Sequence, residues 1–154
     1  MFFILVVTDD SKIVLETHPT KSVIDQHVNG SLTVIWRDWD NIIKNHPKMI
    51  YVSSVNGGET KGPHIHTKRE SYFVCIEGKS VFILKNENGS YTEITSSDDN
   101  PVMVHVPKNI PSAHINLSSK KSRILALANI AWKPNDNEMQ NTTFENYDWS
   151  KWKQ

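Results

Sequence analysis

Short β-type runs follow one another along most of the chain. Within them, β-branched and aromatic residues alternate with polar ones, which is the period of strands rather than helices. Turn signals such as Asn29-Gly30, Asn56-Gly57 and Asn100-Pro101 separate the runs. The pattern predicts an all-β sandwich or barrel. The strands we expect are Lys12–Glu16, Leu32–Arg37, Met49–Val55, Ser71–Glu77, Ser80–Lys85, Tyr91–Thr95, Val102–Val106, Ala113–Leu117 and Arg123–Ile130.

Helical signals are few. Asp38 can cap a short helix from Trp39 to Asn45, which would end before Pro47. A further turn or two is expected between Asn146 and Lys153. The aromatic side chains of this tail offer too much apolar surface to leave in water, so we expect them to pack on the barrel or on a second subunit. They are Phe144, Tyr147, Trp149 and Trp152.

The chain opens on an apolar run from Phe2 to Val7. This run is far too short to cross a membrane, and it lacks the basic start and length of a signal peptide. We interpret it as a strand in a cytoplasmic protein. Because such a strand would be an exposed edge in a monomer, it favours a homodimer formed by strand exchange or sheet extension.

Composition narrows the class of protein. The 154 residues suit one domain spanning 1–154, and 17 Lys plus Arg balance 17 Asp plus Glu. A formal net charge of zero argues against a nucleic-acid or membrane-surface binder that works through bulk charge. The single cysteine, Cys75, excludes a disulfide framework and a Cys-rich zinc module.

The strongest chemical signal is the tripeptide His64-Ile65-His66. Residues two apart on a strand share a face, so the two imidazoles should project together. Such a pair can bind a divalent metal or act as a base with a polar neighbour, although two histidines on a solvated strand face are an alternative. A third histidine, His114, follows on the predicted strand Ala113–Leu117.

These two segments resemble the motifs of the cupin superfamily, which implies a double-stranded β-helix (jelly-roll barrel) with short peripheral helices. The residues that match the first motif are Gly58, His64, His66, Glu70 and Gly78, with one residue too many before the last glycine. In the second motif Ser112 takes the histidine position, and His114 lies two residues further on, on the same face. The second motif is otherwise matched by Pro107, Asn109 and Asn116.

The cupin resemblance leaves a metal enzyme open. A site for Zn²⁺, Ni²⁺ or Fe²⁺ needs three or four ligands at fixed geometry. The ligands implied here are His64, His66, Glu70 and His114. They would belong to a metal-dependent small-molecule dioxygenase or isomerase.

The segment Lys61-Gly62-Pro63-His64-Ile65-His66 resembles more specifically the nucleotide-sugar cupins, the dTDP-4-dehydrorhamnose 3,5-epimerases and dTDP-4-keto-6-deoxyhexose 3,4-ketoisomerases. That resemblance implies a metal-independent isomerase or epimerase without a cofactor. It would move protons beside the 4-keto group of a nucleotide-linked sugar, for surface polysaccharides. His64 then corresponds to the base, His66 to the second proton-transfer residue, and Lys61 to the arginine that holds the diphosphate.

Other candidate site residues come partly from this resemblance and partly from the residue types themselves. The 3,5-epimerases use a tyrosine acid where the alignment places Ala126, so a ketoisomerase or a single-centre epimerase is favoured. Tyr72 is a candidate replacement donor, although strand alternation also explains it. Arg37, between two tryptophans, is a candidate phosphate contact or a packing residue, and Asn116 a substrate contact. A non-catalytic sugar-nucleotide-binding cupin is the remaining alternative.

Overall fold

The computed structural model describes residues 7–9, 11–40 and 46–153, and nearly all its regular structure is antiparallel β-strand. Within these ranges there is no α-helix, and the one short 3₁₀ helix confirms the turn expected in the tail. The elements are β1 (Val7–Asp9), β2 (Lys12–Val14), β3 (Thr17–Lys21), β4 (Val28–Thr33), β5 (Met49–Val55), β6 (Thr60–His66), β7 (Ser71–Glu77), β8 (Lys79–Lys85), β9 (Tyr91–Ser97), β10 (Val102–Val106), β11 (Ser112–Asn116), β12 (Ser122–Ala128), β13 (Met139–Asn141) and η1 (Trp149–Trp152).

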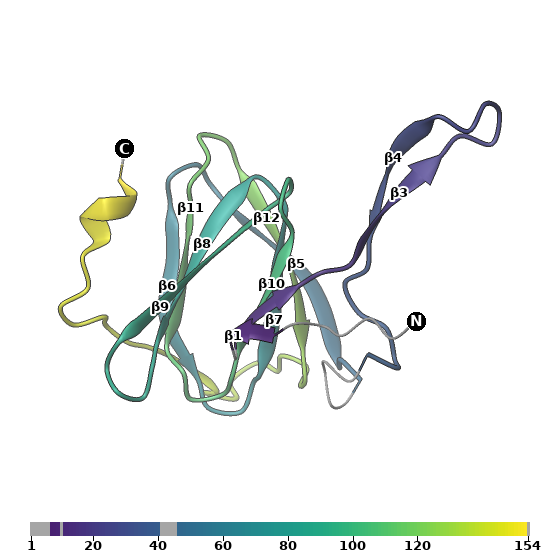
Figure 1. Cartoon of the computed structure of the whole chain (residues 1–154). Helices are drawn as coiled ribbons and strands as arrows, with labels where there is room; N and C mark the ends of the chain where they lie inside the picture. Colours follow the sequence, from purple (N-terminus) through teal and green to yellow (C-terminus); the bar gives the residue numbers. More distant parts are fainter. Residues whose placement is uncertain (1–6, 10, 41–45, 154) are drawn as a thin grey trace.

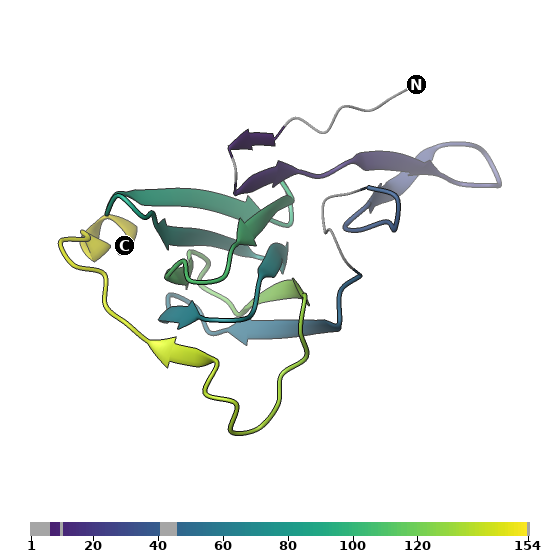
Figure 2. The ribbon, with the colours of Figure 1, turned by 90° about the horizontal axis from the view of Figure 1, so that it is seen from below.

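The strands form two facing sheets, as Figure 2 shows. The larger has the order β1-β2-β10-β7-β12-β5, and the smaller has the order β13-β6-β11-β8-β9. A core of apolar side chains from both sheets fills the space between them, including Cys75, Phe82, Val104 and Ile124. This arrangement is the predicted jelly-roll barrel.

The outer face of each sheet is also covered. On the larger sheet, Ile35 and Trp36 pack over Ile13, Val74 and other residues of that face. On the smaller sheet, the C-terminal tail lies along one side of the barrel, drawn in yellow in Figure 1. Its aromatic residues cover an outer cluster formed by Val81, Ile83, Ala113, Ile115 and Phe144. Of the two packing partners expected for the tail, the structure shows the barrel.

Two local predictions differ from the structure. The strand expected at Leu32–Arg37 ends at Thr33, because β4 starts earlier and pairs with β3. β3 escaped prediction because His18 and Pro19 interrupt any apolar alternation. The expected helix starts with turn and bend residues at Trp39 and Asp40, and its remaining positions, 41–45, lie outside the described residues, as do residues 2–6 of the opening strand.

The β3–β4 hairpin projects well away from the barrel (Figure 1). Its pairing runs from Thr17 opposite Thr33 to Lys21 opposite Val28. At its tip Val23 and Ile24 are 91% and 92% exposed. The hairpin therefore contributes nothing to the core between the two sheets.

Candidate active site

Strand β6 places His64 and His66 on the inner face of the smaller sheet. In the register of this sheet His64 lies opposite Ser112 of β11 and Asn141 of β13, and His66 lies opposite Met139. Side chains directly opposite each other point to the same side of a sheet. Both imidazoles are half-buried. The two rings thus stand side by side at the edge of the space between the sheets, as the spacing predicts.

Each imidazole is held through its Nδ1 atom. His66 Nδ1 lies 2.8 Å from Oε2 of Glu138, and His64 Nδ1 lies 3.1 Å from Oδ1 of Asn141. Because both partners are oxygen acceptors, each ring donates its proton from Nδ1. A neutral ring in this tautomer keeps a lone pair on Nε2, where it can accept a proton.

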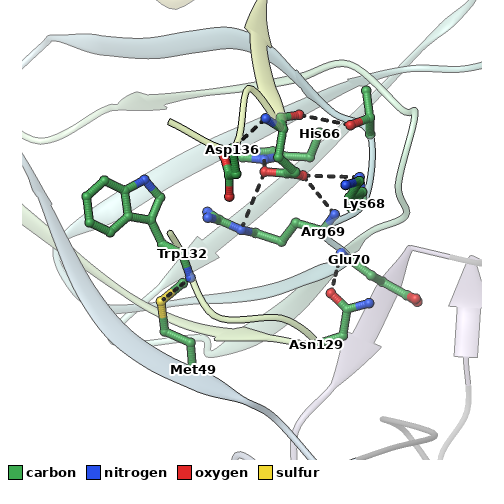
Figure 3. A network of polar contacts seen from close by, with 10 residues as sticks. Met49, His66, Lys68, Arg69, Glu70, Asn129, Trp132 and Asp136 are labelled. Atoms are coloured by element: carbon green, nitrogen blue, oxygen red, sulfur yellow. Dashed lines mark hydrogen bonds and ion pairs between the residues drawn. The ribbon is translucent and has the colours of Figure 1, made fainter. Parts of the chain in front are cut away.

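Glu138 is the buried anchor of the site. Its side chain is 2% exposed, and it accepts hydrogen bonds from the backbone N–H of Lys68 at 3.2 Å and of Arg69 at 2.7 Å as well as from His66. Burial acts to raise the pKa of Glu138, but these hydrogen bonds prevail and lower it. Figure 3 shows how His66, Lys68 and Arg69 converge on this network. The carboxylate is therefore charged at neutral pH beside His66.

Arg69 and Tyr51 extend this network. The Nε atom of Arg69 lies 4.0 Å from Oε2 of Glu138, and its residue is 9% exposed. Tyr51 of β5 hydrogen-bonds to Arg69; burial raises the pKa of this phenol and the guanidinium opposes the rise. No motif in the sequence predicts the contact between Glu138 and His66, because these residues are 72 positions apart. Only the antiparallel pairing of β13 with β6 brings them together.

Lys61 and His114 lie one step further along the same face. In the register of β6 and β11 they are opposite each other, and a β-bulge separates His114 from Ser112. The Lys61 Nζ donates to Oγ of Ser53 in β5 at 2.7 Å, so it bridges the two sheets. The expectation that His114 shares the face of Ser112 is confirmed, because Leu84 and Phe82, which lie opposite them in β8, both belong to the core between the sheets.

His114 is enclosed by aromatic rings. Its ring centroid is 5.2 Å from that of Phe82 and 6.2 Å from that of Phe73. Its Nε2 atom is buried and has no hydrogen-bond partner among the residues that the structure describes. Burial, followed by the electrostatic effects of Lys61 and His64, lowers the pKa of His114 to about 4. This imidazole is therefore neutral at physiological pH.

Tyr72 does not lie with these histidines. It belongs to the outer cluster of the larger sheet. Its neighbour Phe73 packs against the core between the sheets, and successive residues on a strand point to opposite sides. Tyr72 stacks on His105 at 4.5 Å, and its hydroxyl donates to Oε1 of Glu70 at 3.2 Å. The structure thus corrects the assignment of Tyr72 as a donor beside His64.

Glu70 is turned towards the same outer cluster, where it also contacts His105. The four ligands of the metal alternative, His64, His66, Glu70 and His114, are therefore not assembled. Among the described residues no group of three or more His, Cys, Asp or Glu side chains is arranged to hold a metal ion. The donor set does not fit a cupin metal site.

Two residues that were predicted to contact the substrate make structural contacts instead. Asn116 is fully buried, and its Nδ2 donates to the carbonyls of Val55, Asn56 and Lys120, so it fastens loops together. Arg37 binds Glu16 and Asp40, both at 2.8 Å, on the segment beside the hairpin. Neither side chain contacts the histidine site.

A separate open groove of about 480 Å³ lies at the end of β6 that is remote from His66. Gly57, Ser119, Trp149 and Trp152 are among the residues that line it. Its walls come from the outer face and the tail, and none of the three site histidines takes part.

Comparison with known proteins identifies a family from the sequence and a shared fold from solved structures. The sequence model of the family described as "FdtA: WxcM-like, C-terminal" matches residues 15–149. A dTDP sugar isomerase from Desulfovibrio desulfuricans G20 superposes with a TM-score of 0.73 at 15% identity, covering 92% of this chain and 93% of that one. A mutant of the 3,4-ketoisomerase QdtA from Thermoanaerobacterium thermosaccharolyticum, in complex with TDP-4-keto-6-deoxyglucose, gives 0.66 at 19% identity and 86% coverage of both chains.

Larger proteins contain the same fold. The capsular polysaccharide assembling protein CapF from Staphylococcus aureus gives a TM-score of 0.58 at 23% identity over 62% of this chain, which spans only 28% of CapF. No sequence among the curated proteins matches significantly. These likenesses establish the cupin-type barrel. Within the described residues, no helix is long and apolar enough to span a membrane.

Proposed function

Because the chain belongs to the FdtA family of WxcM-like C-terminal domains, we propose that it is an isomerase or epimerase of a nucleotide-linked sugar. The proposed reaction is proton transfer next to the 4-keto group of a dTDP-linked 4-keto-6-deoxyhexose, in the supply of surface-polysaccharide sugars. Support comes from the similar structures, which include a 3,4-ketoisomerase with TDP-4-keto-6-deoxyglucose bound. A 3,5-epimerase from Legionella pneumophila Philadelphia 1 also carries a dTDP-4-keto sugar, with a TM-score of 0.71 at 12% identity.

The observation that carries the proposal is the paired arrangement of His64 and His66. Both rings are inward, and each is held at Nδ1 by an oxygen acceptor. Abstraction of a proton from carbon beside a ketone needs a base whose pKa is near the working pH, and a neutral imidazole supplies it. The Nε2 lone pairs are the atoms that would do this.

In the proposed reaction His64 Nε2 takes the proton from the carbon beside the ketone. The C–H electron pair then forms the enolate double bond, and the carbonyl electron pair moves to the keto oxygen. Return of a proton to the former carbonyl carbon, with the hydroxyl proton of the adjacent carbon moving to the former keto oxygen, gives the ketoisomerase product. Return of a proton to the same carbon from the other side gives an epimer. His66 would exchange protons with the sugar oxygens.

The Glu138 carboxylate fits that role of His66. A carboxylate on Nδ1 orients the imidazole and stabilises the imidazolium that forms when Nε2 is protonated. Glu138 is placed for this at 2.8 Å and is itself buried. It acts as a positioning residue, since it touches His66 and not the sugar.

Lys61 is the proposed contact for the nucleotide diphosphate. Its side chain is exposed, and its ammonium already lies at the gap between the sheets through the bond to Ser53. A lysine offers a point charge rather than the planar fork of an arginine. We therefore assign it attraction for the diphosphate rather than a fixed bidentate geometry.

The test is His64→Asn, followed by incorporation of deuterium from D₂O into a dTDP-4-keto-6-deoxyhexose. We expect loss of exchange by at least about 100-fold, because general-base catalysis is worth that much or more. Affinity for dTDP, measured by calorimetry, should stay within about twofold. The matched control is His27→Asn, the same change on the remote hairpin, where the ring pairs with Asp25.

Exchange at the wild-type rate in His64→Asn would remove His64 as the base. Binding of dTDP by the wild type with no exchange on any 4-keto-6-deoxyhexose would instead favour a non-catalytic sugar-nucleotide-binding protein.

A further inference from the structure

A buried imidazole nitrogen without a partner stands beside the proposed base. The Nε2 atom of His114 has no hydrogen-bond partner among the described residues. A buried polar atom without a hydrogen bond is unfavourable, so its retention requires an explanation, and a partner supplied by a bound ligand is one. The rings of Phe73 and Phe82 pack against the imidazole and offer it no acceptor.

The position of His114 relates it directly to the site. It lies opposite Lys61 in the sheet, and His64 is three residues further along the same strand as Lys61. Lys61 and His64 are both close enough to lower the pKa of His114. The register shifts between Ser112 and His114, and His114 lies opposite Lys61, whose ammonium reaches Ser53 of the other sheet.

The charge state of His114 suits a donor better than a base. A ring that stays neutral at physiological pH cannot hold an extra proton, but its N–H can donate a hydrogen bond. Neutral imidazole is known elsewhere as an electrophile that polarises a carbonyl. Donors aimed at the oxygen where charge develops contribute strongly in a water-excluded site.

We infer that His114 donates a hydrogen bond from Nε2 to the keto oxygen of the sugar and stabilises its enolate. The inference rests on the proposed function. No proton leaves His114: the carbon-bound proton goes to His64, and the electron pair goes to the oxygen that His114 holds. For Lys61 to bind the diphosphate, its ammonium would leave Ser53, to which it donates in the ligand-free protein.

The main test is His114→Phe compared with His114→Gln. Phenylalanine suits the aromatic surroundings and removes the donor, whereas glutamine retains an N–H. We expect His114→Phe to slow deuterium exchange by about 100-fold, the usual effect of removing one such donor. His114→Gln should recover to within about tenfold of wild type. Affinity for dTDP should change by less than about twofold in both, and circular dichroism verifies that both fold.

The outcomes separate this inference from the proposed function. Wild-type exchange in His114→Phe, with exchange abolished in His64→Asn, overturns the donor role and leaves the proposed isomerase intact. A loss of dTDP affinity as large as the loss of exchange overturns it too, because a donor to the enolate acts on the rate. Absence of exchange in the wild type overturns both.

Release of Lys61 has its own measurement. Ser53→Ala removes the bond that Lys61 would have to give up, so dTDP should bind about two- to fivefold more tightly. Thr60→Ala, on the same strand as Lys61, is the control and should leave affinity unchanged. Unchanged affinity in Ser53→Ala overturns the release of Lys61 from Ser53 on binding.

Discussion

The groups that contact the imidazole rings of His64, His66 and His114 differ, and they give the three rings different acid–base properties. His66 donates to a buried carboxylate, and His64 donates to the oxygen of a neutral amide. Aromatic rings enclose His114. A carboxylate favours the protonated imidazole, whereas an apolar enclosure disfavours it. Three side chains of one type can therefore serve as proton carrier, base and neutral donor.

The low pKa of His114 predicts how stability depends on pH. In the unfolded chain this imidazole titrates near 6.5, and in the folded protein only near about 4. Between these values the unfolded state binds more protons, so the free energy of unfolding falls as pH decreases from 6.5 towards 4. At pH 5 the loss relative to pH 7 from this group is about 2 kcal/mol.

Urea unfolding at pH 7 and pH 5 tests this. His114→Phe should lose about 2 kcal/mol less than the wild type over this interval, because the substituted residue does not titrate. Trp132→Phe, at an exposed residue that does not titrate, is the control, and it should keep the wild-type pH dependence. Equal slopes in wild type and His114→Phe would show that burial does not hold this ring neutral.

At the scale of elements, the site depends on which strands are neighbours. β6 supplies the histidines and Lys61, β13 and the loop before it supply Asn141 and Glu138, and β11 supplies His114. The loops that contain Gly57 and Ser119 also approach each other closely. A Cβ atom on Gly57 would lie 2.2 Å from the carbonyl oxygen of Ser119 and would clash with it. The C-terminal tail contributes the outer cover of the sheet that carries the site.

The tail should be a structural part of the barrel. Phe144 is 7% exposed, and its ring stacks on Trp149 at 5.6 Å and contacts Tyr91 at 5.1 Å. Phe144→Ala should lower the free energy of unfolding by about 3 kcal/mol, through lost burial and the cavity left behind. Chemical denaturation measures this effect.

Trp132→Ala provides the matched control, because Trp132 is 62% exposed and its removal should cost less than about 0.5 kcal/mol. If Phe144→Ala were equally mild, the tail would pack on the barrel without stabilising it.

At the scale of the whole molecule, the projecting hairpin is the outstanding feature (Figure 1). It presents Val23 and Ile24 almost fully to solvent, with Val28 and Leu32 more than half exposed. The β5 edge of the larger sheet also exposes apolar side chains, Ile50 at 59% and Val52 at 49%. Apolar surface of this kind on an arm is typical of an interaction site.

We therefore expect a homodimer in which the hairpin packs on a second copy. Light scattering after gel filtration should give twice the chain mass of 17.6 kDa. The double variant Val23→Asp and Ile24→Asp should give the monomer mass, because two desolvated carboxylates would be costly in an apolar interface. Ser31→Asp, also exposed on the hairpin, is the control. A wild-type monomer, or a dimer unaffected by the double variant, would contradict this arrangement.

The sequence by itself determined most strands of the two facing sheets and the shared face of His64 and His66. Both follow from local periodicity, because a strand alternates its side chains whatever the rest of the chain does. The displaced His114 was also placed on the right face, since a shift of two residues preserves the side of a strand.

Tertiary structure alone decided what stands behind and beside each of these residues. The pairing of Glu138 with His66 joins positions 72 residues apart, and the turning of Tyr72 and Glu70 to the outer cluster depends on which face of β7 looks inward. Strand periodicity does not reveal which of two faces is the core when both are covered, as they are on the larger sheet. Nor does a motif show that the side-chain amide of Asn116 donates hydrogen bonds to three backbone carbonyls. Partners distant in sequence are chosen by sheet order and packing, which the local pattern does not encode.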